Sequence, residues 1–217
     1  MIPSFNFNEF LTEFSSLSIF IPLIVGFSRI RTLFLEQRIL LGYIILAAIT
    51  EFISSNLASR RINNLALLHI FTAIEFAFLV AYFHYIFKKV GFEFFSKTII
   101  TFFLTFVLIN INFFESLDSF NANSRSLEGL ILIVLSALWL FKFSTNSKSL
   151  LIGETAAFWG CSAILFYFSG TLFIFASSKF LIENWADFYP SIWTIHSFCN
   201  IIFSLLLGKA LWNKIKA

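Results

Sequence analysis

Apolar runs of roughly 20 residues recur along the whole of this 217-residue chain. A helix needs about that length to cross the hydrocarbon core of a bilayer, whereas a spanning strand would be shorter and would alternate polar and apolar residues. Charged residues make up 12% of the chain, against about 25% in soluble proteins. The pattern predicts an all-α integral membrane bundle, and it leaves no stretch for a separate soluble catalytic module.

Seven runs are long enough to span a membrane. Together they predict a single transmembrane helical domain covering residues 1–217, with spans at 10–28, 39–58, 65–87, 98–114, 127–143, 150–176 and 191–212. The first nine residues contain no Lys or Arg, and Glu13 interrupts the first run. Because a signal peptide begins with a positive segment, we interpret the first run as a retained span.

The basic residues in the connections predict how the bundle is oriented. The connections on one side carry eleven Lys and Arg, and those on the other side carry four, with Arg125 counted among the four. Cytoplasmic loops are enriched in these residues. We therefore expect the N-terminus outside, the C-terminus in the cytoplasm, and a multi-pass protein of the cytoplasmic (inner) membrane.

Six ionisable residues interrupt the apolar runs, namely Glu13, Glu51, His69, Glu75, Glu154 and His196. Such groups cost several kcal/mol at bilayer depth and therefore mark candidate functional positions. At 1.5 Å per helical residue, Glu13 and Glu154 fall near the membrane surface. The other four lie in the outer half of the bundle, roughly 6–15 Å below its boundary.

Helical spacing places these polar residues on a few helix faces. His69, Thr72 and Glu75 follow one another at intervals of three and fan over one face of the third span. His196 and Asn200 are four apart and stack on one face of the seventh span. The predicted ligand- or ion-binding site, open to the outside, consists of Glu51, His69, Thr72, Glu75, Trp193, His196 and Asn200.

Three interpretations of this cluster are open. The residues could form structural pairs, Glu51 with His69 and Glu75 with His196 or Asn200. They could line a pocket for a small ligand, an ion or a proton, since histidine titrates near neutral pH. Two histidines and a carboxylate could also hold catalytic zinc. Because no His-Glu-x-x-His or His-x-x-x-His motif is present, we assign no metal ligands and no cofactor.

The leading functional hypothesis is a membrane protein that binds or senses a small ligand, ion or proton. A channel or transporter is the alternative, although seven spans do not divide into the inverted halves typical of transporters. A metal-assisted intramembrane hydrolase is the second alternative, so an enzymatic activity is the less favoured interpretation and no catalytic residue is assigned.

The expected partners are the lipid bilayer, a small ligand or ion, and a second copy of the chain or another membrane protein, with no nucleic acid.

The segment 68–76, LHIFTAIEF, resembles a stretch of poorly characterised bacterial seven-span integral membrane proteins. The resemblance implies a small bacterial inner-membrane protein and brings no activity with it. The topology also resembles that of rhodopsins and of seven-span zinc hydrolases. Lys209 lies too close to the cytoplasmic end for a retinal lysine, and Asn200 stands where the hydrolases have the second histidine of their last span.

Overall fold

The computed structural model describes residues 7–92, 95–146, 152–184 and 189–213, and these are helical throughout apart from short connections. The helices are α1 (Phe7–Ser18), α2 (Phe20–Ser28), α3 (Leu35–Ser59), α4 (Leu65–Lys89), α5 (Ser96–Phe113), α6 (Ala122–Asn146), α7 (Ala156–Asn184) and α8 (Tyr189–Trp212), with a 3₁₀ turn at Ile152–Glu154. Taking α1 and α2 together, the described residues contain seven helical segments long and apolar enough to span a membrane. The prediction of an all-helical, seven-span membrane protein is confirmed.

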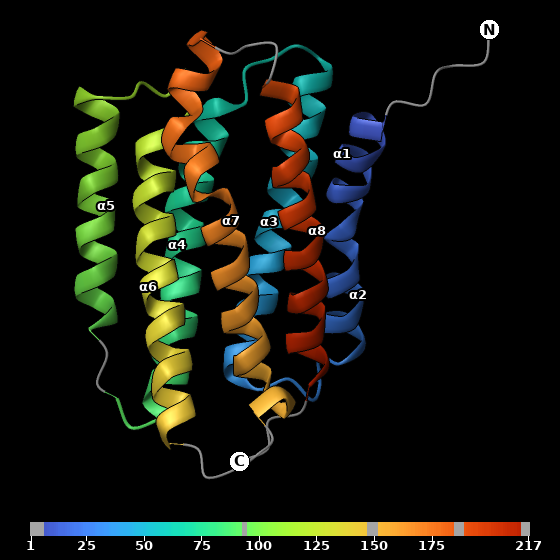
Figure 1. Cartoon of the computed structure of the whole chain (residues 1–217), viewed down its shortest axis with the longest axis vertical. Helices are drawn as coiled ribbons and strands as arrows, with labels where there is room; N and C mark the ends of the chain where they lie inside the picture. Colours follow the sequence, from blue (N-terminus) through green and yellow to red (C-terminus); the bar gives the residue numbers. More distant parts are fainter. Residues whose placement is uncertain (1–6, 93–94, 147–151, 185–188, 214–217) are drawn as a thin grey trace, which may run out of the picture.

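The first span is interrupted between α1 and α2. The turn falls at Ile19, three residues before Pro22. Proline has no backbone N–H and cannot donate to the carbonyl one turn earlier, so a helix weakens at that point. The hydroxyl of Ser18 donates to the carbonyl of Ser15 (2.6 Å) beside the interruption. We attribute the interruption to Pro22. Helices α1 and α2 together still cross the length of the bundle (Figure 1).

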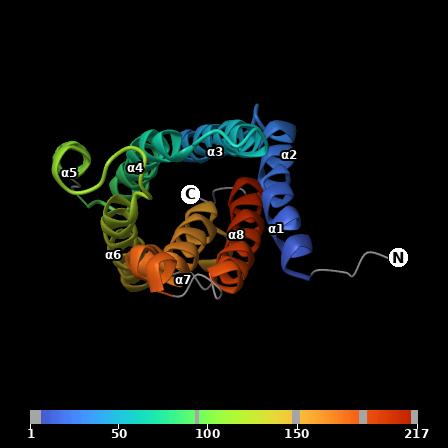
Figure 2. The same ribbon diagram turned by 90° about the horizontal axis from the view of Figure 1, so that it is seen from above.

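Six of the seven spans form a closed ring. Going round it, α3 packs on α4, α4 on α6, α6 on α7, α7 on α8, and α8 on α1 and α2, while α2 returns to α3. Helix α5 lies outside the ring against α4 and α6, as the view along the bundle shows (Figure 2). It is attached by the stacked rings of Phe76 and Phe103, whose centroids are 3.9 Å apart. The ring leaves an interior in which side chains from six spans can meet.

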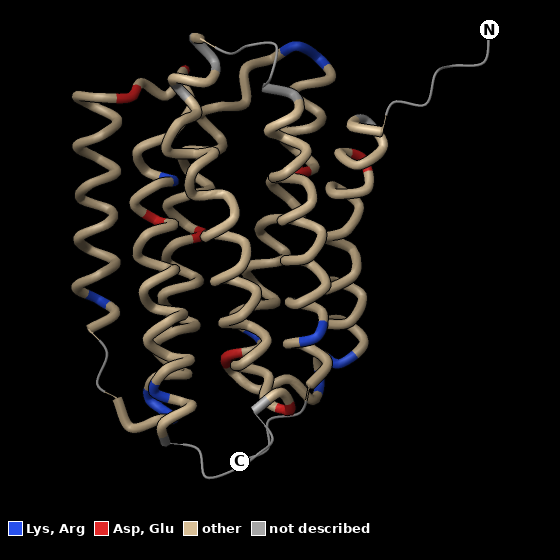
Figure 3. Tube along the Cα trace, in the orientation of Figure 1, with Lys and Arg blue, Asp and Glu red and all other residues tan. Residues whose placement is uncertain are grey.

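We call the end of the bundle at which α1 begins the upper end, as drawn in Figure 1, and the opposite end the lower end. Most Lys and Arg lie toward the lower end, with few at the upper end (Figure 3). This distribution is the basis of the predicted orientation, in which the upper end faces outside. The orientation itself stays a prediction.

Helix α6 begins at Ala122, five residues before the start predicted at 127. Arg125 therefore lies in the helix, where its amide donates to the carbonyl of Asn121 (3.0 Å), and only 9% of the residue is exposed. Assigning Arg125 to an outer connection was wrong. Because α6 begins at Ala122, Glu128 lies on the same helix as Arg125, about one turn further along it. The predicted start of the sixth span, residue 150, falls outside the described residues.

The lower half of the ring is filled by apolar side chains. The largest fully buried ones include Leu40 of α3, Phe83 of α4, Trp139 of α6 and Phe168 of α7. Many phenylalanines on the outer face are exposed instead, as expected of a surface that meets lipid. Close packing in the interior, rather than hydrophobic burial, holds membrane helices together, because lipid is as apolar as the core.

Two phenylalanines of α7 test this account of packing. Phe168 is 1% exposed, whereas Phe173 is 75% exposed. We expect Phe168→Ala to lower the free energy of unfolding by about 3 kcal/mol through the cavity it leaves. Phe173→Ala should leave it nearly unchanged. Unfolding in mixed micelles measures both variants, and an equal loss in the two would contradict the helix orientation described here.

Candidate functional site

The interior of the ring contains a pocket of about 280 Å³ near its upper end. Its walls come from α1, α3, α4, α7 and α8, together with the start of α6 and the residues just before it. The pocket lies at the level where α3, α4 and α8 carry their polar residues. A seven-span bundle thus encloses a space with polar side chains in its walls.

Six of the seven residues predicted for the site line this pocket. They are Glu51, Thr72, Glu75, Trp193, His196 and Asn200. His69 is not among the lining residues. It is 1% exposed, and its Nε2 lies 3.0 Å from the carbonyl oxygen of Ser119, in the connection between α5 and α6. His69 therefore contacts this connection, whereas Glu75, at the other end of the spaced trio, faces the pocket.

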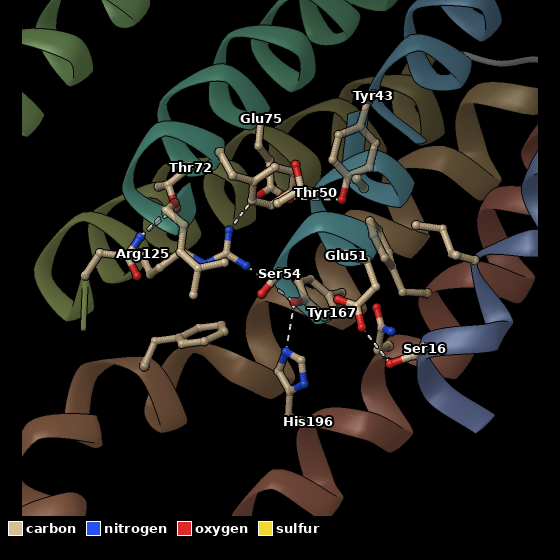
Figure 4. A pocket seen from close by; sticks show the side chains of 18 of the residues that line it. Ser16, Tyr43, Thr50, Glu51, Ser54, Thr72, Glu75, Arg125, Tyr167 and His196 are labelled. Atoms are coloured by element: carbon tan, nitrogen blue, oxygen red, sulfur yellow. Dashed lines mark hydrogen bonds and ion pairs between the residues drawn. The ribbon is translucent and has the colours of Figure 1, made fainter. Parts of the chain in front are cut away.

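A buried ionic group lies in the wall of the pocket. The guanidinium of Arg125 forms ion pairs with Glu75 on α4 and with Glu128 on its own helix, the latter at 2.9 Å. Glu75 is 1% exposed and Glu128 is fully buried. Figure 4 shows the Arg125 side chain directed at Glu75. We call Arg125, Glu75 and Glu128 the ionic triad.

Two tyrosines extend the triad across the ring. Tyr43 of α3 donates its hydroxyl to Oε1 of Glu75 (2.9 Å). Tyr167 of α7 places its hydroxyl 3.5 Å from Nη2 of Arg125 and 3.1 Å from Nε2 of His196 (Figure 4). The resulting chain of polar contacts runs through α3, α4, α6, α7 and α8, so five spans meet at one network.

A separate set of hydrogen bonds holds α1 to the ring. Ser16 donates to Oε1 of Glu51 (2.7 Å), and Asn200 donates to Oγ of Ser15 (3.0 Å). The predicted structural pairs are therefore not the observed ones. Glu51 pairs with Ser16 rather than His69, and Glu75 pairs with Arg125 and Tyr43 rather than with His196 or Asn200.

The charges of the triad do not balance. Two carboxylates share one guanidinium, and Oε1 of Glu128 is buried with no hydrogen-bond partner among the described residues. An isolated negative charge is costly in a low-dielectric interior, and a proton or another positive group compensates it. The site is therefore suited to hold a proton or a cation.

The geometry offers no support for a zinc hydrolase. His69 and His196 have different surroundings, one against Ser119 and the other against Tyr167. In the part of the chain that the structure describes, no three His, Cys, Asp or Glu side chains are grouped so that they could hold a metal ion. The two histidines and one carboxylate considered from the sequence do not come together.

The sequence interpretation missed Arg125, Glu128, Tyr43 and Tyr167. Two signals were available. Arg125 and Glu128 stand three apart, a spacing that pairs opposite charges on one helix face. Tyrosines inside apolar runs normally find a polar partner for their hydroxyls when they are buried. The first signal depends on α6 beginning before residue 125, whereas the second needs only the spans that contain Tyr43 and Tyr167.

Comparisons with known proteins identify no relative. The chain matches no protein-family model, no curated protein and no solved structure. The comparisons therefore add no support to the resemblance to bacterial seven-span proteins and offer no other family. The classification as a multi-pass membrane protein comes from the helices alone.

Removing the guanidinium should unbalance the triad further. We expect Arg125→Met to lower the free energy of unfolding by about 3–5 kcal/mol, because two buried carboxylates lose the one ion-pair partner that they have among the described residues. Arg60→Met replaces an exposed arginine near the upper end and serves as the matched control, with little change expected. Unfolding in mixed micelles near neutral pH compares the two. Equal stability of both variants would contradict a buried ion pair.

Proposed function

We propose that this protein is a multi-pass protein of the cytoplasmic membrane, with its N-terminus outside, that binds a small ligand, ion or proton in an outward-facing pocket. The observation that carries the proposal is the polar pocket at membrane depth, with the ionic triad in its wall. Buried charges are expensive in a membrane, and they are typically found where a ligand, ion or proton is handled. The predicted orientation puts the upper end outside.

The closed floor of the pocket favours binding over an open channel. Below Tyr43 and Glu75, the described side chains of Leu40, Leu79 and Phe83 are fully buried and pack tightly. A permanently open pore would need a polar path through this layer. Transport would require the lower half of the ring to separate, and the dense packing there opposes such a movement.

The network also supports a sensing role. The polar contacts around the triad join five spans, and a separate pair of hydrogen bonds, from Ser16 to Glu51 and from Asn200 to Ser15, holds α1 to α3 and α8. A ligand that displaces one of these contacts alters the packing between helices. The bend between α1 and α2 near Pro22 gives the first span a point at which it can move.

Cysteine labelling in intact cells tests whether the pocket is water-filled and faces outside. Ser54 lines the pocket on α3, whereas Phe52 on the same helix is 72% exposed on the outer face. In a background lacking Cys161 and Cys199, we expect Ser54→Cys to react with a membrane-impermeant maleimide. The reacting species is the thiolate, which attacks the maleimide and forms readily only where water solvates its charge, so Phe52→Cys in the lipid should react far more slowly.

Inverted membrane vesicles complete this experiment. Labelling of Ser54→Cys in intact cells but not in inverted vesicles supports both the water-filled pocket and its outward orientation. Labelling only in inverted vesicles would show that the pocket faces the cytoplasm, which is the opposite of the predicted orientation. Equal, slow labelling of both variants from both sides would show that water does not reach the pocket, and the proposal would then fail.

A further inference from the structure

The walls of the pocket carry more negative than positive charge. Among the described lining residues, Glu51, Glu75 and Arg125 are the charged ones, and Glu128 contacts Arg125 from behind. Three carboxyl groups thus accompany one guanidinium. If one proton neutralises the triad, Glu51 still leaves a negative charge on the wall. Opposite charges attract each other more strongly beside a protein wall than in bulk water, so the pocket favours a positive ligand.

The guanidinium of Arg125 has one nitrogen, Nη1, that is taken up by the protein's own carboxylates. Its Nη1 contacts Glu75 and Glu128, and its Nη2 lies near the hydroxyl of Tyr167. Its Cζ is 4.9 Å from the centroid of the Phe175 ring. An anion that approached Nη2 would lie close to the two carboxylates held at Nη1, which would repel it. Arg125 therefore acts as the ion-pair partner of Glu75 and Glu128 rather than as a binding group for an anion.

Glu51 is the carboxylate that a ligand can reach. Its Oε1 accepts a hydrogen bond from Ser16, and its side chain lines the pocket (Figure 4). Among the described residues no Lys, Arg or His forms an ion pair with it. Glu75 is buried, whereas Glu51 is an exposed residue. It can accept a hydrogen bond from a cation that enters the pocket.

An aromatic wall completes the pocket. The rings of Phe120, Phe175, Trp193 and His196 contact one another, with centroid separations from 4.8 Å (Trp193–His196) to 6.4 Å (Phe120–Trp193). Aromatic faces attract cations, and clusters of such rings bind ammonium groups. Phe175 already takes the guanidinium of Arg125 against its ring, so this wall accommodates a cation within the protein itself.

From these observations we propose that the pocket binds a small organic cation, a monoamine with a short apolar group. Its ammonium would be held by Glu51 and its apolar part by the aromatic wall. A volume of about 280 Å³ lies just below the usual range of about 300–1,000 Å³ for ligand pockets, which suits a compact amine. This assignment rests on the proposed function and narrows it to one class of ligand.

Three four-carbon probes that differ in charge test the assignment. Butylammonium, butan-1-ol and butyrate are titrated into the full-length protein in lipid nanodiscs, with empty nanodiscs as the blank, and binding is followed by saturation-transfer NMR. We expect saturable binding of butylammonium only. Glu51→Gln should weaken it at least tenfold. Glu13→Gln removes an exposed carboxylate that does not line the pocket, and should leave the affinity unchanged.

The outcomes separate this inference from the proposed function. Saturable binding of the alcohol or of butyrate in place of the amine would overturn the cation assignment while supporting a ligand pocket. Equal weakening by Glu51→Gln and Glu13→Gln would overturn the role of Glu51. If no probe binds, the cation assignment falls, and the labelling of Ser54→Cys decides separately whether the pocket is open. Unchanged melting temperatures of both variants exclude unfolding as the cause.

Discussion

The structure depends on one buried interaction, the pairing of Arg125 with Glu75 and Glu128 inside the ring. Each charge alone would be costly at this depth, and each is tolerated because the others are present. The triad draws α4 and α6 together, and Tyr43 and Tyr167 join α3 and α7 to it. A group this polar requires an interior that is not wholly apolar, and the pocket forms beside it.

The pocket and the dense lower half have complementary roles. Below Glu75, buried apolar side chains such as Leu40, Leu79 and Phe83 pack closely between the helices. Above them, ion pairs and hydrogen bonds join the helices in addition to the ring contacts of the aromatic wall. Polar contacts can exchange partners with a ligand at small cost, whereas packed side chains cannot move without leaving a cavity. The upper half is therefore suited to respond to binding.

Much of this arrangement could be predicted from the sequence, and the errors have one origin. Run length predicts the spans, and the cost of buried charge predicts that Glu51, Glu75 and His196 lie at a site. Helical spacing cannot say which residues at the edge of a face point inward, and His69 contacts Ser119 instead of lining the pocket. Arg125 was missed because a basic residue in a polar segment was assigned to a loop, although its partners lie one turn into the bilayer. Pairing across helices is a property of the fold that one sequence does not reveal.

A double-mutant cycle between Arg125 and Glu75 tests the central claim most directly. The free energies of unfolding of Arg125→Met, Glu75→Gln and the double variant, measured in mixed micelles, give the coupling between the two side chains. We predict a favourable coupling of about 2 kcal/mol or more, with the double variant more stable than Arg125→Met alone. A coupling within about 0.5 kcal/mol of zero would show that the two residues act independently. That result would contradict the account.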